Sequence, residues 1–222
     1  MKSKVDIPCT YGRLYIREFN ESDRPSLLEF AEDPSLLQFM LFNLGNDTEI
    51  DGFLTLAQAE ANKENRMEWH FALEEKETRT FLGSVALMLE KDSPSSAELG
   101  YWFKRDAWGK GYATEASRFL LHVGFQSIGL HRIWGKCHVR NPASARVMEK
   151  LGMKLEGCIR EHVWMRDHYR SSKIYSMLEN EYQPRPGKTL SIFAARMKSF
   201  SDNPATKHGS AALARYAGFL IE

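Results

Sequence analysis

The chain has few cysteines, almost no net charge and no long apolar run. Cys9, Cys137 and Cys158 are odd in number and widely separated, which fits neither a disulfide framework nor the CxxC spacing of a zinc site. Reduced thiols in a cytoplasm are therefore expected, without a metal. Thirty Lys and Arg oppose 29 Asp and Glu, so no strong field favours nucleic acid or an anionic membrane. No stretch approaches the roughly 20 apolar residues of a membrane span, and no signal peptide is evident.

The hydrophobic residues of the chain suffice for one substantial core. The chain has 222 residues, of which 43% are hydrophobic. The composition changes after Tyr182, where Gln183-Pro184-Arg185-Pro186-Gly187 forms a stiff break. We therefore predict one domain over residues 10–182 and a C-terminal tail over residues 183–222, whose role is open. Short helices are conceivable in this tail near Leu190–Phe200 and Ala211–Leu220.

The first half of the domain combines strand-like and helix-like stretches. Residues 12–19 alternate imperfectly between apolar and polar side chains and end at residues typical of a helix cap. Apolar residues at helical spacing then predict helices at about Asp23–Phe42 and Thr48–Lys63. Three strands are expected next, at Met67–Leu73, Phe81–Leu89 and Ala97–Phe103. The short polar connections between them predict antiparallel neighbours.

The second half has the order helix, strand, helix, hairpin. The predicted elements are a helix at Tyr112–Phe125, a strand at His131–Val139, a helix at Pro142–Leu151, and hairpin strands at Met153–Arg166 and Tyr169–Leu178. A crossover helix makes the strands on either side of it parallel, so Ala97–Phe103 and His131–Val139 should run in the same direction. The fold class is therefore α+β, with a mixed and mostly antiparallel sheet.

A glycine-rich loop, Trp108-Gly109-Lys110-Gly111, joins one of these strands to the helix at Tyr112–Phe125. Unpaired N–H groups at a helix start lie at the positive end of the helix dipole and favour a phosphate. The two glycines leave these groups accessible, and Lys110 adds a positive charge. A GxG turn alone is a weak sign, since such glycines often serve only the turn. The spacing does not match the Walker or the dinucleotide phosphate loops.

Several motifs in order give a specific resemblance. They are Tyr101-Trp102-Phe103 followed by Trp108 to Ala116, then His131-Arg132-Ile133-Trp134, then Asn141 to Met153. Together with the opening strand Leu14–Phe19, they closely resemble the GNAT acetyltransferases, and within these the branch that includes enzymes acetylating ribosomal-protein N-termini. The resemblance covers about residues 10–180. It implies a GNAT-type sheet in which two parallel strands splay apart, with flanking helices and the pantetheine arm of acetyl-CoA in the gap.

The resemblance also implies which residues hold acetyl-CoA. The pyrophosphate is expected on the loop and helix start formed by Trp108, Gly109, Lys110, Gly111, Tyr112 and Ala113. A bulge at Tyr101–Phe103 is expected to free backbone amides for the thioester, so that Trp102 and Phe103 contact the cofactor. Asn141 and Ser144 are expected beside the pantetheine arm. Two departures from the family pattern are Asp106, where Gln or Arg is common, and Met148, where many members have the tyrosine that protonates the leaving thiolate.

Acetyl transfer to an amine needs a base and a donor to the leaving sulfur. Glu98 resembles a strand glutamate that other members use through water, and a salt-bridged structural role is the alternative. Ser144 could donate to the sulfur, or could simply satisfy the helix start. Cys137 could carry the acyl group, but nothing marks its thiol as activated, so direct transfer is preferred. Weaker candidates are His70, His138 and His162 as bases, and Trp69, Phe71, Trp164 and Tyr169 as walls of the acceptor pocket.

The leading functional hypothesis is transfer of an acetyl group from acetyl-CoA to a primary amine, at a protein N-terminus. A small-molecule acceptor such as a polyamine, an aminoglycoside or an amino acid stays open, although Lys76 and Arg79 interrupt the acidic residues around them that a polycation would need. A non-catalytic acyl-CoA-binding regulator is a third alternative because of Asp106 and Met148. The sequence leaves the oligomeric state open, a homodimer included.

Overall fold

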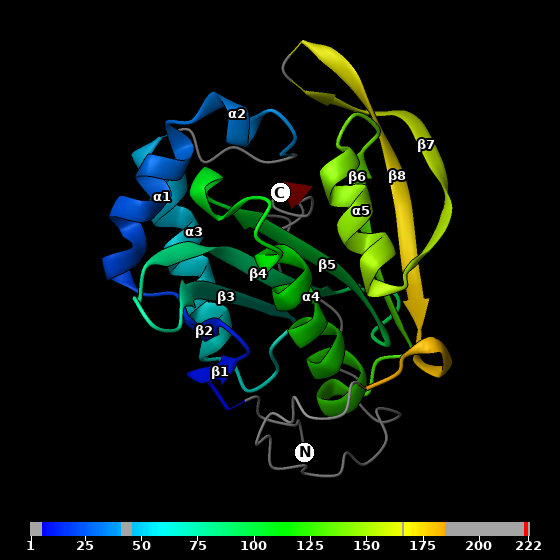
Figure 1. Cartoon of the computed structure of the whole chain (residues 1–222), viewed down its shortest axis with the longest axis horizontal. Coiled ribbons are helices and arrows are strands. Elements are labelled where there is room, and N and C mark those ends of the chain that lie inside the picture. The colour runs from blue at the N-terminus through cyan, green and yellow to red at the C-terminus, as the bar shows by residue number, and fades with distance from the viewer. Residues whose placement is uncertain (1–5, 41–45, 166, 185–219, 222) are drawn as a thin grey trace.

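A computed structural model describes residues 6–40, 46–165, 167–184 and 220–221. Within these residues one mixed sheet has helices on both faces (Figure 1). Its strands are β1 (Cys9–Tyr11), β2 (Leu14–Glu18), β3 (Glu68–Glu75), β4 (Phe81–Leu89), β5 (Ser96–Phe103), β6 (Arg132–His138), β7 (Lys154–Met165), β8 (His168–Leu178) and β9 (Leu220–Ile221). The spatial order is β1-β2-β3-β4-β5-β6-β8-β7, and β9 pairs with β5.

The helical elements lie between these strands. They are η1 (Glu21–Asp23), α1 (Arg24–Ala31), α2 (Pro34–Leu37), α3 (Asp47–Ala61), η2 (Arg105–Ala107), α4 (Tyr112–His122), the π-helical η3 (Val123–Ile128), α5 (Pro142–Leu151) and η4 (Glu179–Glu181). The predicted α+β class, with its mostly antiparallel sheet and one parallel crossover, is confirmed. No helix among the described residues combines the length and the apolar character that crossing a membrane requires.

Two local predictions differ from the structure, and a third falls almost entirely outside the described residues. The helix expected over Asp23–Phe42 is divided, because the Asp33 carboxylate caps a new helix at the Ser35 N–H and Pro34 has no N–H to continue α1. The short strand β1 was not expected and pairs with β2. The tail helices lie outside the described residues, apart from Leu220, which belongs to β9.

Two hydrophobic cores lie on opposite faces of the sheet. Leu99, Tyr101 and Phe103 of β5 belong to the core that includes α4 and α5, whereas Trp102 belongs to the core beneath α1 and α3. This alternation follows from the two-residue period of a strand. Glu98 is an even number of residues from Trp102, so both side chains point to the same face of the sheet. Leu99, Tyr101 and Phe103 point to the opposite face.

The parallel strands β5 and β6 pair over only a short length. The partners are Ser96↔Arg132, Ala97↔Ile133 and Glu98↔Trp134. Beyond them β5 continues along β4 and β6 continues along β8, so the two parallel strands separate. The edge of β5 exposed by this separation pairs with β9, at Tyr101↔Leu220 and Trp102↔Ile221.

The bulge predicted at Tyr101–Phe103 is wrong. The pairing of β5 with β4 is regular up to Phe103, which lies opposite Gly83. A β-carbon on Gly83 would collide with the Trp102 carbonyl oxygen, so the glycine allows the strands to approach closely without an extra residue. Any free N–H groups of β5 near the gap must therefore lie on the edge of β5 from which β6 has separated.

Candidate active site

The glycine-rich loop has the backbone geometry of an open helix start. Gly109 has φ 68° and Gly111, the N-cap of α4, has φ 80°. Both values lie in the left-handed region, which costs other residues about 1 to 2 kcal/mol. A β-carbon on Gly109 would meet nothing within 4 Å, so this side of the loop is open. The N–H groups at the start of α4 are therefore suited to an anion.

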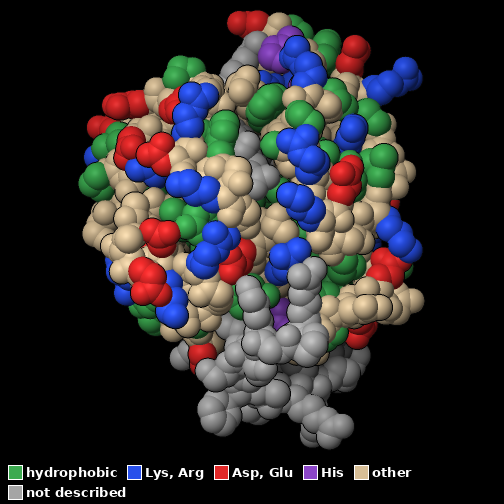
Figure 2. Space-filling model, viewed as in Figure 1, with side chains coloured by type: hydrophobic (Ala, Val, Ile, Leu, Met, Phe, Trp, Pro, Cys, Tyr) green, Lys and Arg blue, Asp and Glu red, His purple; other side chains and the backbone are tan. Residues whose placement is uncertain are grey.

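Arg13, from the turn between β1 and β2, holds this loop in place. Its Nη2 donates to the Lys110 carbonyl oxygen at 3.0 Å, and its Nε donates to Glu115 of α4 at 2.9 Å. Its guanidinium also lies 4.4 Å from the centre of the Tyr112 ring, and the Tyr112 hydroxyl donates to Glu75 at 2.6 Å. Arg13 was not among the predicted site residues, because nothing local in the sequence links it to a loop about a hundred residues away. Lys and Arg side chains also flank the seam between this loop and α5 (Figure 2).

Asp106, the departure from the family pattern, lies on η2 next to the loop. It lines a groove together with Glu29, Asp33, Lys104 and Arg105, between η2 and the α1–α2 segment. Glu32 also lines this groove and Lys104 is paired with Glu29, so its two basic residues offset the negative charge around Asp106 only in part. On the loop itself, Trp108 Nε1 donates to the Phe103 carbonyl oxygen at 2.9 Å, which fixes the end of β5 against the phosphate-loop candidate.

The start of α5 faces β5 across the gap. The Asn141 side chain caps α5 by accepting a hydrogen bond from the Ser144 N–H at 3.0 Å. The Ser144 hydroxyl is 3.0 Å from the Tyr101 hydroxyl, and both residues are fully buried. The capping role considered for Ser144 is therefore performed by Asn141. Tyr101 was missed as a functional candidate, although the two-residue period of β5 directs it toward α5.

Trp102 and Phe103 can reach a cofactor only through their backbone. The Trp102 ring is completely buried, with its centre 4.2 Å from that of Phe30, and Phe103 is buried in the opposite core. The Trp102 backbone pairs with Ile221 on the edge where the pantetheine arm is expected. A cofactor that lies along this edge would therefore take the position of β9.

Glu98 lies where β5 and β6 separate, on the face opposite Tyr101. Its carboxylate forms a salt bridge with Lys136 Nζ at 3.2 Å, and only 6% of the residue is exposed. Burial raises the pKa of Glu98, while the charge of Lys136 acts to lower it. The ammonium of Lys136 also lies 5.5 Å from the centre of the Trp134 ring. Glu98, the residue expected to act as the base, is therefore also a member of a salt bridge, so both roles considered for it involve the same carboxylate.

The other nucleophile and base candidates have structural surroundings. Burial raises the pKa of the Cys137 thiol to about 11, so the thiol is protonated and weakly nucleophilic at neutral pH. His70 lies 2.9 Å from Glu68, and His162 lies 2.9 Å from the Ser172 hydroxyl. The His138 ring packs against Phe39, and burial lowers the pKa of His138.

Two of the four aromatic residues considered as pocket walls are core residues. Trp69 and Phe71 belong to the core that includes α4, because their parity on β3 directs them there, so that interpretation is wrong for both. Trp164 and Tyr169 are more than half exposed at the turn between β7 and β8, where their rings are in edge contact at 4.8 Å. Only this second pair is available to a ligand.

Comparison with known proteins agrees with this arrangement. Residues 13–154 match the family described as the acetyltransferase (GNAT) domain. The chain is 27% identical over 183 residues to the uncharacterized N-acetyltransferase p20 of Bacillus licheniformis, which covers 77% of this chain and 95% of the relative. A GNAT-family acetyltransferase from Bacillus anthracis has a TM-score of 0.68 at 25% identity, over 78% of this chain and 98% of that one.

Two further similarities involve proteins with described acceptors. The ribosomal-protein-serine acetyltransferase of Escherichia coli is 35% identical over 83 residues, which are 37% of this chain and 46% of the relative. A spermidine N-acetyltransferase from Vibrio cholerae, solved with CoA and spermine, has a TM-score of 0.65 at 20% identity, over 76% of this chain and 97% of that one. The second similarity concerns the fold alone.

Proposed function

Because this chain belongs to the GNAT acetyltransferases, we infer that it transfers the acetyl group of acetyl-CoA to a protein N-terminal amine, by direct attack in a ternary complex. The observation that carries this inference is the separation of β5 and β6 after Glu98, next to the phosphate-loop candidate at Gly109–Gly111. A pantetheine arm along the open edge of β5 would connect the two places. Two similarities support the choice of acceptor. The motifs resemble those of enzymes that acetylate ribosomal-protein N-termini, and one relative is the ribosomal-protein-serine acetyltransferase of E. coli.

The amine and the cofactor would approach the gap from opposite faces. Glu98, through a water molecule, takes a proton from the amine as its nitrogen attacks the thioester carbon. The bond from carbon to sulfur then breaks, and the thiolate receives a proton from the Ser144 hydroxyl, which Tyr101 can replenish across their 3.0 Å contact. After the products leave, Glu98 releases its proton to solvent and the Ser144–Tyr101 pair takes one up, so the cycle closes. This relay would take the place of the tyrosine that Met148 replaces, and it uses residues from β5 and α5.

Ser144→Ala is expected to lower kcat about tenfold or more, because the leaving sulfur loses its hydrogen-bond donor. The Kd for acetyl-CoA should change little, since Asn141 still caps α5. Steady-state kinetics and calorimetry measure the two effects. Ser117→Ala removes another fully buried serine hydroxyl, from α4, and serves as the matched control. Wild-type kcat in the Ser144 variant would contradict the relay.

The strand β9 is expected to compete with acetyl-CoA for the edge of β5. A chain ending at Phe219 lacks Leu220 and Ile221, and should bind acetyl-CoA several-fold more tightly in calorimetry, because no strand has to leave first. Proline at both positions in the full-length chain removes the backbone donors and should have the same effect. Unchanged affinity in both proteins would show that the cofactor does not use this edge.

The acceptor class is tested by the release of CoA from acetyl-CoA. A panel of peptides with free and blocked N-termini, without lysine, is compared with spermidine, an aminoglycoside and free amino acids. We expect turnover with free N-termini and none with blocked ones. Turnover with spermidine alone would contradict the proposed acceptor, and acetyl-CoA binding without any turnover would favour a regulator.

A further inference from the structure

The salt bridge between Glu98 and Lys136 joins the two parallel strands at the place where they begin to separate. Glu98 and Trp134 form the last pair of β5 with β6. Lys136 lies two residues further along β6, so it shares a face with Trp134, and its ammonium group lies 3.2 Å from the Glu98 carboxylate. The contact therefore crosses the opening in which the acceptor amine would meet the thioester.

Both partners of this salt bridge are shielded from solvent. The side chains of Glu98 and Lys136 are 8% and 15% exposed. Among the described residues, Lys136 is the one group that forms a hydrogen bond or salt bridge with the Glu98 carboxylate. A buried carboxylate without a partner takes up a proton rather than keep its charge. The charged form of Glu98 therefore depends on Lys136.

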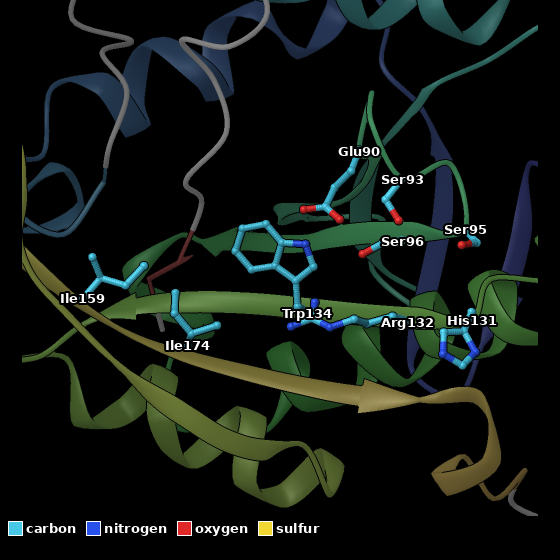
Figure 3. Close-up of a pocket in the computed structure, with 9 residues that line it drawn as sticks. All are labelled: Glu90, Ser93, Ser95, Ser96, His131, Arg132, Trp134, Ile159 and Ile174. Atoms are coloured by element: carbon cyan, nitrogen blue, oxygen red, sulfur yellow. The ribbon is translucent and has the colours of Figure 1, made fainter.

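Two other charged side chains near the pair do not replace Lys136. Burial is the main cause that raises the pKa of Glu98, and the negative charge of Glu90, in the connection between β4 and β5, raises it further. The Glu90 side chain points toward Trp134 across a pocket of about 380 Å³ (Figure 3). Arg132, which lines the same pocket, is held by Glu156 at 2.6 Å.

Three further titratable groups lie around the pair. Glu68, on β3, is two strands away from the carboxylate and lies 2.9 Å from His70. Burial lowers the pKa of both His138 and His162, and the charge of Lys136 adds to this effect on His162. Both rings are therefore mostly neutral at pH 7, and neither supplies a positive charge to the carboxylate.

We propose that Lys136 is a positioning residue for acetyl transfer: its ammonium group keeps the buried Glu98 carboxylate charged and fixed at the opening between β5 and β6, where it takes the proton of the amine. This inference rests on the proposed function and adds a residue to it. Lys136 acts through Glu98 and not on the substrate. Its positive charge also opposes the protonated form of the pair, so it favours release of the proton from Glu98 to solvent after each turnover.

Lys136→Met removes the charge and keeps a long apolar side chain. The pKa of Glu98 should then rise further, so the acid limb of the kcat profile, measured with a saturating peptide, should move toward alkaline pH by about one unit or more. Lys136→Arg should keep the wild-type profile. Glu90→Gln removes a like charge and should move the limb the opposite way. An unmoved limb in Lys136→Met would overturn the proposal.

Lys63→Met is the matched control for the loss of a lysine from a buried carboxylate. Lys63 pairs with Glu60 on α3, far along the chain from Glu98. Its replacement should leave the acid limb of the kcat profile where the wild type has it. A shift equal to that of Lys136→Met would show that the limb responds to stability and would contradict the assignment.

Melting temperatures test the same pair without turnover. The folded-state pKa of Glu98 lies above its unfolded value, so the stability that depends on a protonated Glu98 is lost as the pH rises through the folded-state pKa. The melting temperature lost in Lys136→Met should therefore be large at pH 8 and smaller at pH 5, and adding Glu98→Gln should remove this difference. A loss that does not vary with pH would refute the role of Lys136, whereas a wild-type chain without turnover would refute only the proposed function.

Discussion

Glu98→Gln is expected to lower kcat about a hundredfold or more at pH 7, with an unchanged Kd for acetyl-CoA. An N-terminal amine has a pKa near 8, so it is mostly protonated at neutral pH and needs a base as it attacks. Glutamine keeps the size of Glu98 and cannot accept the proton. Steady-state kinetics with a peptide acceptor, and calorimetry with acetyl-CoA, measure the two quantities separately.

The pH dependence gives a second test of the same residue. Burial raises the pKa of Glu98 above its ordinary value of 4.5, so wild-type kcat should fall as the pH drops through that raised pKa and Glu98 becomes protonated. The Glu98 variant should instead gain rate as the pH rises and the amine loses its proton. Glu60→Gln removes another buried carboxylate that pairs with a lysine, on α3, and is the matched control. A fully active Glu98 variant would overturn the assignment of the base.

Gly111→Ala is expected to weaken acetyl-CoA binding about thirtyfold or more. A methyl group at this N-cap would crowd a pyrophosphate on the α4 amides, and the loss of one charge-assisted contact is worth roughly 2 kcal/mol. Alanine at φ 80° also strains the backbone, so the effect on binding must be separated from an effect on the fold. Calorimetric titration of the folded variant measures the affinity.

Gly129→Ala is the control for that strain. Gly129 has φ 79°, nearly the value of Gly111, and caps the end of η3. It should lower stability by a similar amount and leave the Kd for acetyl-CoA unchanged. Equal losses of affinity in the two variants would show that Gly111 acts only through the backbone.

The features that could be predicted from the sequence are those that depend on residues close together in the chain. Strand β4 and helix α5 have the predicted bounds, because periodicity and the Asn141-Pro142 helix start are local signals. The loop at Gly109–Gly111 was also found locally. The Asp33-Pro34 break before α2 has a local signal of the same kind, a helix cap followed by proline, although the predicted helix ran through it.

The site features that were not predicted depend on contacts between segments that are far apart in the sequence. Arg13 supports a loop 97 residues away, and Tyr101 meets Ser144 only because α5 returns to β5. The domain boundary at residue 182 remains a proposal, since β9 belongs to the same sheet.

Initial rates measured over a grid of acetyl-CoA and peptide concentrations test direct transfer at the gap between β5 and β6. Direct attack requires both substrates to be bound together, so the reciprocal plots should intersect, and Cys137→Ala should keep nearly full activity. Parallel plots, together with an acetylated Cys137 trapped during turnover, would contradict the account and assign the transfer to a covalent intermediate.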